Sequence, residues 1–185
     1  MAESLGIIGL GHMGIVAAQK YVDAGYTVYG YARRKEVIDK FTSFGGNHVS
    51  SPAEVAKKSD KVIVYVLNDA QVIEVVTGKN GILAGKHSGT GVVCMATIDR
   101  KNLEMVAAEC AQNGVGFVDC PVTGGPGRVE SGTLTLIVAG ARDYVEECRS
   151  ILEVQGNITY IGEEPGLGQA VKHCNQLLVG TTQAA

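Results

Sequence analysis

The chain has 185 residues, of which 45% are hydrophobic and 19% charged, a composition typical of one globular domain with a sizeable core and a piece of a second. Its formal net charge is −3 and it has no basic stripe, so neither a nucleic acid nor an anionic membrane surface has electrostatic support as a partner. The five cysteines are dispersed and lack Cys-x-x-Cys spacing, which predicts reduced thiols in a cytoplasmic protein that acts on small molecules.

The first predicted strand ends in a glycine motif. An apolar run over residues 5–10 leads into Gly9, Leu10, Gly11, His12, Met13 and Gly14, and a helix-like stretch follows. In this strand–turn–helix context the pattern Gly-x-Gly-x-x-Gly predicts a dinucleotide site, in which the turn approaches a pyrophosphate and the helix N-terminus offers N–H groups. An ordinary glycine-rich turn of another α/β protein is the alternative. The apolar run is too short to span a membrane and has no signal-peptide pattern.

The second predicted strand, residues 27–31, decides between the two nicotinamide cofactors. A carboxylate at its end would bind the ribose diol of NAD, whereas arginine accommodates the 2′-phosphate of NADP. Here Arg33 and Arg34 follow the strand and no carboxylate stands beside them, which favours NADP. Two alternatives keep NAD open: the arginines form a solvated helix start, or one of them stacks on adenine.

Further apolar runs at 61–67, 91–95 and 116–119 alternate with helical spacing at 37–44 and 103–110. Ser51 to Glu54 reads as a capping box, with proline at the first helical position, that opens a short helix before the strand predicted at 61–67. Later strands are expected at 134–139 and 158–161, around a helix at 143–155. The alternation predicts an α/β fold of the Rossmann type: a doubly wound, mostly parallel sheet with helices on both faces, followed by the start of a long helix.

Two later segments suggest catalysis. In the loop at 119–127, the Thr123 hydroxyl stands beside Gly124 and Gly125, whose backbone N–H groups can hold a carboxylate. In the helix pattern at 166–178, Lys172 and Asn175 share one face, and burial there would lower the lysine pKa toward the range useful for proton transfer. That burial is expected from the apolar neighbours Ala170, Val171, Cys174, Leu177 and Leu178. A plain surface loop and a solvated surface lysine are the alternatives.

At these motifs the chain resembles the β-hydroxyacid dehydrogenase family, which includes 3-hydroxyisobutyrate dehydrogenase and tartronate semialdehyde reductase. The resemblance implies reversible hydride transfer between NADP(H) and a small 3-hydroxy acid or semialdehyde carboxylate. It implies Lys172 as the general acid and base, Asn175 with the segment 123–125 as the substrate site, and Thr97 near the nicotinamide. Serine is usual where Thr123 stands. The family's Leu-Pro-Asn/Asp after the third strand is replaced by Leu67-Asn68-Asp69, and Leu67 and Asn68 are expected to contact the cofactor.

The resemblance also implies an organisation. Residues 1–163 are expected to form the cofactor domain and 164–185 the start of an interdomain helix, in a longer or truncated enzyme whose helical C-terminal domain lies outside this chain. A homo-oligomer, in the family a dimer, is expected through that helix and that domain. The alternatives are a non-catalytic NADP-binding or oligomerisation module and an imine reductase-like enzyme, which normally has another proton donor at position 172. His12, His173 and the cysteines have no metal-ligand spacing, so no metal is expected.

Overall fold

The structure is a computed structural model that describes residues 3–184. Within that range the strands form a nine-stranded sheet in the order β3-β2-β1-β4-β5-β6-β8-β7, with β9 paired to β8. The strands are β1 (Ser4–Ile8), β2 (Thr27–Tyr31), β3 (Asn47–His48), β4 (Lys61–Val64), β5 (Gly91–Cys94), β6 (Gly116–Asp119), β7 (Val122–Thr123), β8 (Leu134–Ala139) and β9 (Gly156–Gly162).

The six strands from β3 to β6 pair in parallel. The sheet then changes direction, since β8 lies antiparallel to both β6 and β7, whereas β9 runs parallel to β8. The predicted mostly parallel, doubly wound sheet is therefore confirmed.

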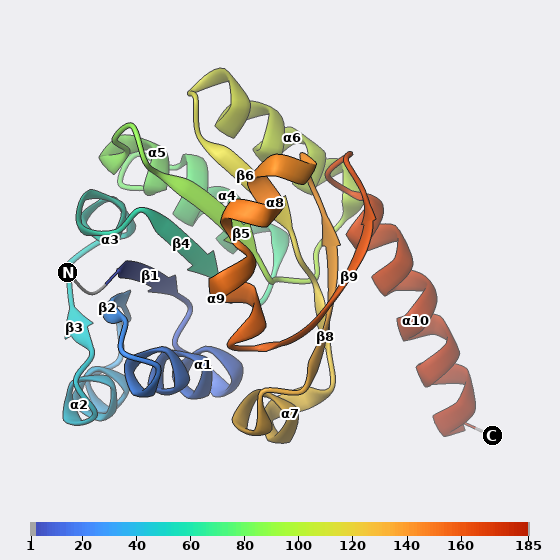
Figure 1. The fold of residues 1–185 in the computed structure, drawn as a ribbon, viewed down its shortest axis with the longest axis horizontal. Helices are drawn as coiled ribbons and strands as arrows, with labels where there is room; N and C mark the ends of the chain where they lie inside the picture. Colours follow the sequence, from blue (N-terminus) through green and yellow to red (C-terminus); the bar gives the residue numbers. More distant parts are fainter. Residues whose placement is uncertain (1–2, 185) are drawn as a thin grey trace.

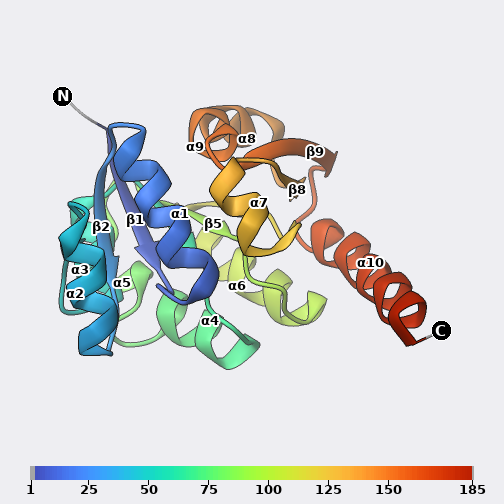
Figure 2. The same ribbon diagram turned by 90° about the horizontal axis from the view of Figure 1, so that it is seen from below.

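Ten helices accompany the sheet in the described part of the chain: α1 (His12–Asp23), α2 (Lys35–Ser43), α3 (Pro52–Lys58), α4 (Asp69–Thr77), α5 (Ile82–Gly85), α6 (Arg100–Gln112), α7 (Gly125–Ser131), α8 (Arg142–Glu147), α9 (Arg149–Glu153) and α10 (Leu167–Ala184). They divide between the two faces of the sheet. One hydrophobic core contains buried residues of α1, α2, α8 and α9, and the other contains residues of α3 to α6. Figures 1 and 2 show α10 projecting from the body on the side away from the N-terminus.

Alternation along the central strands supplies both cores. In β4, Ile63 faces the core of α1 while Val62 and Val64 face the core of α3 to α6, and all three are fully buried. Such strands, buried on both faces, give continuous apolar runs in a sequence. This is why the apolar runs predicted the strands well.

Two glycines leave the space that the Phe41 ring fills. The fully buried Phe41 of α2 packs on Gly30 of β2 and on Gly46, where added Cβ atoms would lie 2.8 and 2.3 Å from the ring. Neither position has room for a larger residue, because these distances are far below van der Waals contact. Helix α2 therefore packs closely on β2, the strand that leads to Arg33.

The structure also departs from the sequence prediction in detail. The predicted helix at 143–155 is wrong as one element, because the chain turns at Cys148 (φ −88°, ψ −3°) and forms α8 and α9. The two-residue strands β3 and β7 were not predicted. Ser51 does cap α3, since its Oγ accepts from the Glu54 backbone N–H at 3.2 Å, with Pro52 in the first turn. No helix among residues 3–184 has the length and apolar character needed to cross a membrane.

Candidate active site

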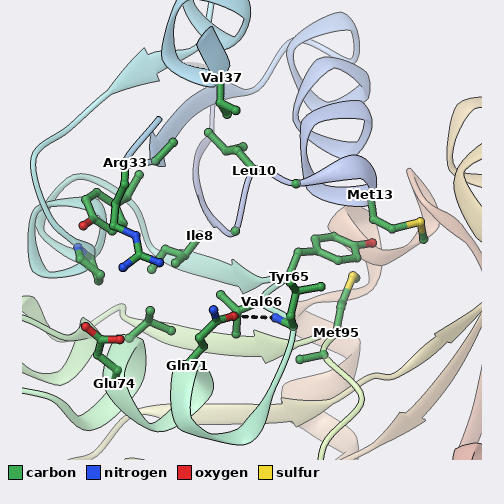
Figure 3. A pocket seen from close by; sticks show the side chains of 18 of the residues that line it. Ile8, Leu10, Met13, Arg33, Val37, Tyr65, Val66, Gln71, Glu74 and Met95 are labelled. Atoms are coloured by element: carbon green, nitrogen blue, oxygen red, sulfur yellow. Dashed lines mark hydrogen bonds between the residues drawn. The ribbon is translucent and has the colours of Figure 1, made fainter. Parts of the chain in front are cut away.

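A cleft of about 850 Å³ opens at the carboxyl edge of the parallel strands, where ligands bind in open α/β sheets. Its walls come from the segments that follow β1, β2, β4 and β5 (Figure 3). Of the residues predicted to bind cofactor, the following line it: Gly9, Leu10, Gly11, His12, Met13, Arg33, Arg34, Leu67 and Thr97. Two predicted residues, Gly14 and Asn68, do not line the cleft and have structural contacts instead.

The three glycines of the first turn differ in what surrounds them. Gly9 has φ +97°, and an added Cβ would lie 2.5 Å from the Tyr65 backbone. An added Cβ on Gly14 would lie 2.1 Å from the Gly9 carbonyl oxygen, so this glycine lets α1 pack on the turn. Around Gly11 the space is open for 4 Å. Gly11 is also the N-cap of α1 and offers no side chain, so the first-turn N–H groups are free to meet an anion.

At the end of β2, both arginines are exposed and border the cleft. Arg34 has a loose ion pair with Glu36 at 3.7 Å, between side chains that are 69% and 71% exposed. Further polar residues line this end and were not predicted as site residues, among them Ser50, Ser51, Glu74 and Lys79. They belong to segments distant in sequence, and Ser51 stood only in the predicted cap of α3, so no sequence signal marked them as cleft residues. Figure 3 shows Glu74 on the wall opposite Arg33.

The loop after β4, where proline is usual in the family, is held by two side chain–backbone hydrogen bonds. The Gln71 backbone N–H donates to Asn68 Oδ1 at 3.0 Å, and Gln71 Oε1 accepts from the Leu67 backbone N–H at 2.9 Å. These reciprocal bonds resemble a capping box and start α4 without proline. Leu67 consequently stays at the cleft, 86% exposed, while the Asn68 side chain is occupied with the helix.

The far end of the cleft is lined by Met95, Ala96, Thr97, Val122 and Tyr65. Tyr65 was not predicted as a site residue. Its hydroxyl donates to Gln155 Oε1 at 3.4 Å, and burial raises the pKa of the phenol, so this wall is neutral at ordinary pH. Figure 3 shows its ring between Met13 and Met95. This end of the cleft is therefore mostly apolar.

Asn175 of α10 meets Thr123 next to that end, and Lys172 precedes Asn175 by three residues on the same helix. Asn175 Nδ2 donates to Thr123 Oγ1 at 3.5 Å, and Val122, one residue before, lines the cleft. Gly124 and Gly125 have φ +133° and +71°, conformations that favour glycine. Lys172 is 6% exposed, and desolvation by burial lowers its pKa, in the predicted direction. Lys172, Asn175 and the segment 123–125 do not line the cleft themselves, and Val122 is the cleft residue adjacent to that segment in the chain.

One expectation about α10 is wrong. Its apolar residues were expected to bury it, yet Val171 is 40% exposed, Leu177 71% and Leu178 69%, and Cys174 is exposed too. The buried positions of its first half are Gly168, Gln169 and Lys172. The polar face of α10 therefore packs on the domain, while the apolar face meets no other residue of the described chain closely enough to be buried.

The hydrogen bonds that hold the polar face of α10 against the domain were also not predicted. Asp119, at the end of β6, accepts hydrogen bonds at the start of α10, and Gln169 connects it to the segment after β5. Both residues are fully buried. No signal in the sequence indicated a contact between positions 50 residues apart.

Several residues stay outside the proposed chemistry. His12 is exposed at the mouth of the cleft, and His173 is half-buried near Asp69. Burial raises the pKa of the Cys94 thiol to about 12 and that of Cys120 well above its ordinary value, which disfavours thiolate chemistry. Among the residues that the structure describes, no group of three or more His, Cys, Asp or Glu could hold a metal ion.

The chain is similar to known dehydrogenases and to a nucleotide-binding domain. Residues 4–162 match the model of the NAD binding domain of 6-phosphogluconate dehydrogenase. The chain is 34% identical to an L-threonate dehydrogenase of Cupriavidus necator, covering 100% of this chain and 63% of that protein. It is 37% identical to the mitochondrial 3-hydroxyisobutyrate dehydrogenase of Mus musculus, covering 97% and 55%. The chain thus spans between about half and two-thirds of the length of these relatives.

Solved structures agree with the fold. The 3-hydroxyisobutyrate dehydrogenase of Salmonella typhimurium matches with a TM-score of 0.91 at 28% identity, covering 98% of this chain and 64% of that one. An imine reductase of Streptomyces aurantiacus matches with a TM-score of 0.86 at 25% identity, covering 96% and 62%.

Proposed function

Since this chain belongs to the β-hydroxyacid dehydrogenase family, within which it corresponds to the NAD-binding domain, we propose that the complete protein is a dehydrogenase of small 3-hydroxy acids. Hydride would pass between NADP(H) and the carbon that bears the substrate hydroxyl, and the product of oxidation would be a semialdehyde carboxylate. The observation that supports the proposal is that Lys172 is buried on α10, three residues before Asn175, whose side chain contacts Thr123 next to the cleft.

The bound nicotinamide would supply or accept the hydride. During reduction the carbonyl electron pair moves to oxygen, and Lys172 Nζ donates a proton to that oxygen; during oxidation the neutral amine takes the hydroxyl proton. Thr123 with the N–H groups of Gly124 and Gly125 would hold the substrate carboxylate, and Asn175 would orient an oxygen beside the lysine. Desolvation supports this assignment, because a lowered pKa increases the fraction of neutral amine at any given pH.

The cofactor would bind with its pyrophosphate at the turn from Gly9 to Gly14 and the N-terminus of α1. We propose NADP rather than NAD, because Arg33 and Arg34 border the cleft where a 2′-phosphate would lie and no carboxylate ends β2. Leu67 and Thr97 would contact the cofactor toward the nicotinamide end. Asn68 would act indirectly, by fixing the start of α4.

The test is the Lys172→Met variant of the complete protein. Hydride transfer is followed by NADPH absorbance with semialdehydes, 3-hydroxyisobutyrate and L-threonate, the last two taken from the names of the relatives. We expect turnover to fall by about 10² to 10⁴, as is typical for loss of a general acid, with NADPH affinity retained. Lys86→Met, at an exposed lysine, is the matched control. Undiminished turnover in Lys172→Met would falsify the lysine assignment.

Two other functions give distinct outcomes. An imine reductase-like enzyme, suggested by the shared fold, would reduce cyclic imines and leave 3-hydroxy acids untouched. A non-catalytic module would bind NADPH and turn over no substrate of either panel. The retained Lys172 favours the dehydrogenase over both.

We further propose the cofactor domain at 1–163 and the start of an interdomain helix at 164–185. A homo-oligomer through the exposed apolar face of α10 is supported by Val171, Leu177, Leu178 and Val179, which are all at least 40% exposed. The cytoplasm is the proposed location, because the four buried cysteines are free thiols.

A further inference from the structure

A buried carboxylate fastens the first turn of α10 to the end of β6. Asp119 Oδ2 accepts from the backbone N–H groups of Gly166 at 2.8 Å and Gln169 at 3.2 Å, and Asp119 Oδ1 accepts from Gln169 Nε2 at 2.8 Å. Burial raises the pKa of Asp119, while these hydrogen bonds act in the opposite direction. A buried carboxylate is costly without such donors, so the arrangement depends on all of them.

Gln169 extends the contact to the cofactor cleft. Its Oε1 accepts from the Ile98 backbone N–H at 3.0 Å, and its Nε2 also donates to the Ala96 carbonyl oxygen at 3.1 Å. These two backbone groups flank Thr97, and Ala96 and Thr97 both line the cleft. One fully buried amide therefore joins the cleft wall at the end of β5 to the helix that bears Lys172.

The helix start has no free space in which to shift. A Cβ added to Gly168 would lie 2.9 Å from Asp119 Oδ2 and 3.0 Å from the Ile137 carbonyl oxygen. Gly166 has φ +98°, and its added Cβ would lie 2.9 Å from Glu104 Oε1. Gly168 thus lets α10 approach the sheet, and Gly166 lets the residue before α10 approach α6, so that the Asp119 bonds can form.

Lys172 follows Gln169 by three residues, so the two side chains lie on the same face of α10, one turn apart. We propose that Asp119 and Gln169 are positioning residues that hold the amine of Lys172 at a fixed place relative to the nicotinamide end of the cleft. The inference rests on the proposed function of Lys172. Neither residue is proposed to touch the substrate.

The experiment compares Gln169→Met and Asp119→Asn with the parent in the complete protein. Gln169→Met nearly keeps the side-chain volume and removes all three hydrogen bonds of the side-chain amide. We expect kcat to fall on the order of tenfold to a hundredfold, the size seen when reacting groups are misplaced by about 1 Å. We expect the Kd of NADPH and the KM of the substrate to change less than threefold, because the residues that hold both ligands remain. We expect the limb of the pH–rate profile that reports Lys172 to move to higher pH, because water then reaches the amine.

Gly168→Ala perturbs the same place without removing a hydrogen-bonding group, and we expect it to lower kcat as well. Gly180→Ala, on the same helix with open space around it, and Gln112→Met, at an exposed glutamine, are the matched controls and should leave kcat unchanged. If Gln169→Met does not fold, by circular dichroism and thermal melting, Gly168→Ala and Asp119→Asn decide in its place.

The outcomes separate the two proposals. Loss of turnover in Lys172→Met, with unchanged kcat and an unchanged pH profile in folded Gln169→Met and Asp119→Asn, overturns this inference alone. Full turnover in Lys172→Met overturns the proposed function. A fall in kcat accompanied by the shifted pH limb supports the inference, since a purely structural loss of folded enzyme would lower kcat and leave the limb in place.

Discussion

Replacing Arg33 by alanine should reduce the preference of the protein for NADPH over NADH. The two cofactors differ only in the 2′-phosphate, so the ratio of their dissociation constants isolates the groups near that phosphate. Arg33 borders the cleft after β2, and no carboxylate lies within ion-pair distance of it among the described residues. Its guanidinium is therefore available to a phosphate.

The expected size follows from the exposure of the side chain. Hydrogen bonds to charged groups contribute about 1.5 to 3 kcal/mol when they are sheltered. Arg33 is exposed, so water competes and the lower end applies. About 1.5 kcal/mol corresponds to a roughly tenfold loss of NADPH affinity, with NADH affinity little changed. Arg34, already near Glu36, should contribute less.

The assay is isothermal titration of both cofactors at one fixed ionic strength, because phosphate contacts weaken with salt. Glu74→Gln should shift the ratio the other way, since a carboxylate on the opposite wall repels the 2′-phosphate. Arg142→Ala, an exposed arginine away from the cleft, is the control. Equal affinities of the parent protein for the two cofactors, or an equal loss of both in Arg33→Ala, would refute the reasoning.

Three further predictions concern the lysine, the core and a helix cap. Desolvation holds the pKa of Lys172 below its usual 10.5. As the pH rises through that pKa, reduction, which needs the ammonium, should slow, and oxidation, which needs the amine, should speed up. The same pH dependence for reduction and oxidation would contradict this. Phe41→Ala should lower the free energy of unfolding by about 3 to 5 kcal/mol in urea, more than Phe44→Ala at a half-buried ring, and equal losses would show that Phe41 is no special anchor. Asn68→Ala should cost about 1 kcal/mol in the same assay through the lost cap of α4, and an equal loss in the exposed control Asn157→Ala would remove that explanation.

The elements that could be predicted are those with a local signal. β2, β6 and β8 have the bounds that their apolar runs indicated, because strands buried on both faces need continuous apolar residues. The glycine turn could also be predicted, since Gly9 and Gly14 stand where an added Cβ would collide with backbone atoms. The two-residue strands β3 and β7 could not be found, because so short a run has no period.

Contacts between distant segments were out of reach for a different reason. Glu74 and Lys79 join the cleft wall only through the winding of the sheet, and Asp119 meets Gln169 across 50 residues. The apolar pattern of α10 revealed that the helix is amphipathic but not which side packs on the domain. The side that packs on the domain is the one on which Gln169 makes buried hydrogen bonds with segments distant in the sequence.

Because α10 packs on the domain with its polar face, its apolar face and its buried lysine point to different sides of the helix. Anything that covers Leu177 and Leu178 must come from outside, whereas under the proposed function a substrate would reach the amine from the cleft side. Substituting the outward leucines should therefore change assembly and solubility without altering proton transfer. Engineering of quaternary structure and engineering of chemistry can proceed on this helix independently.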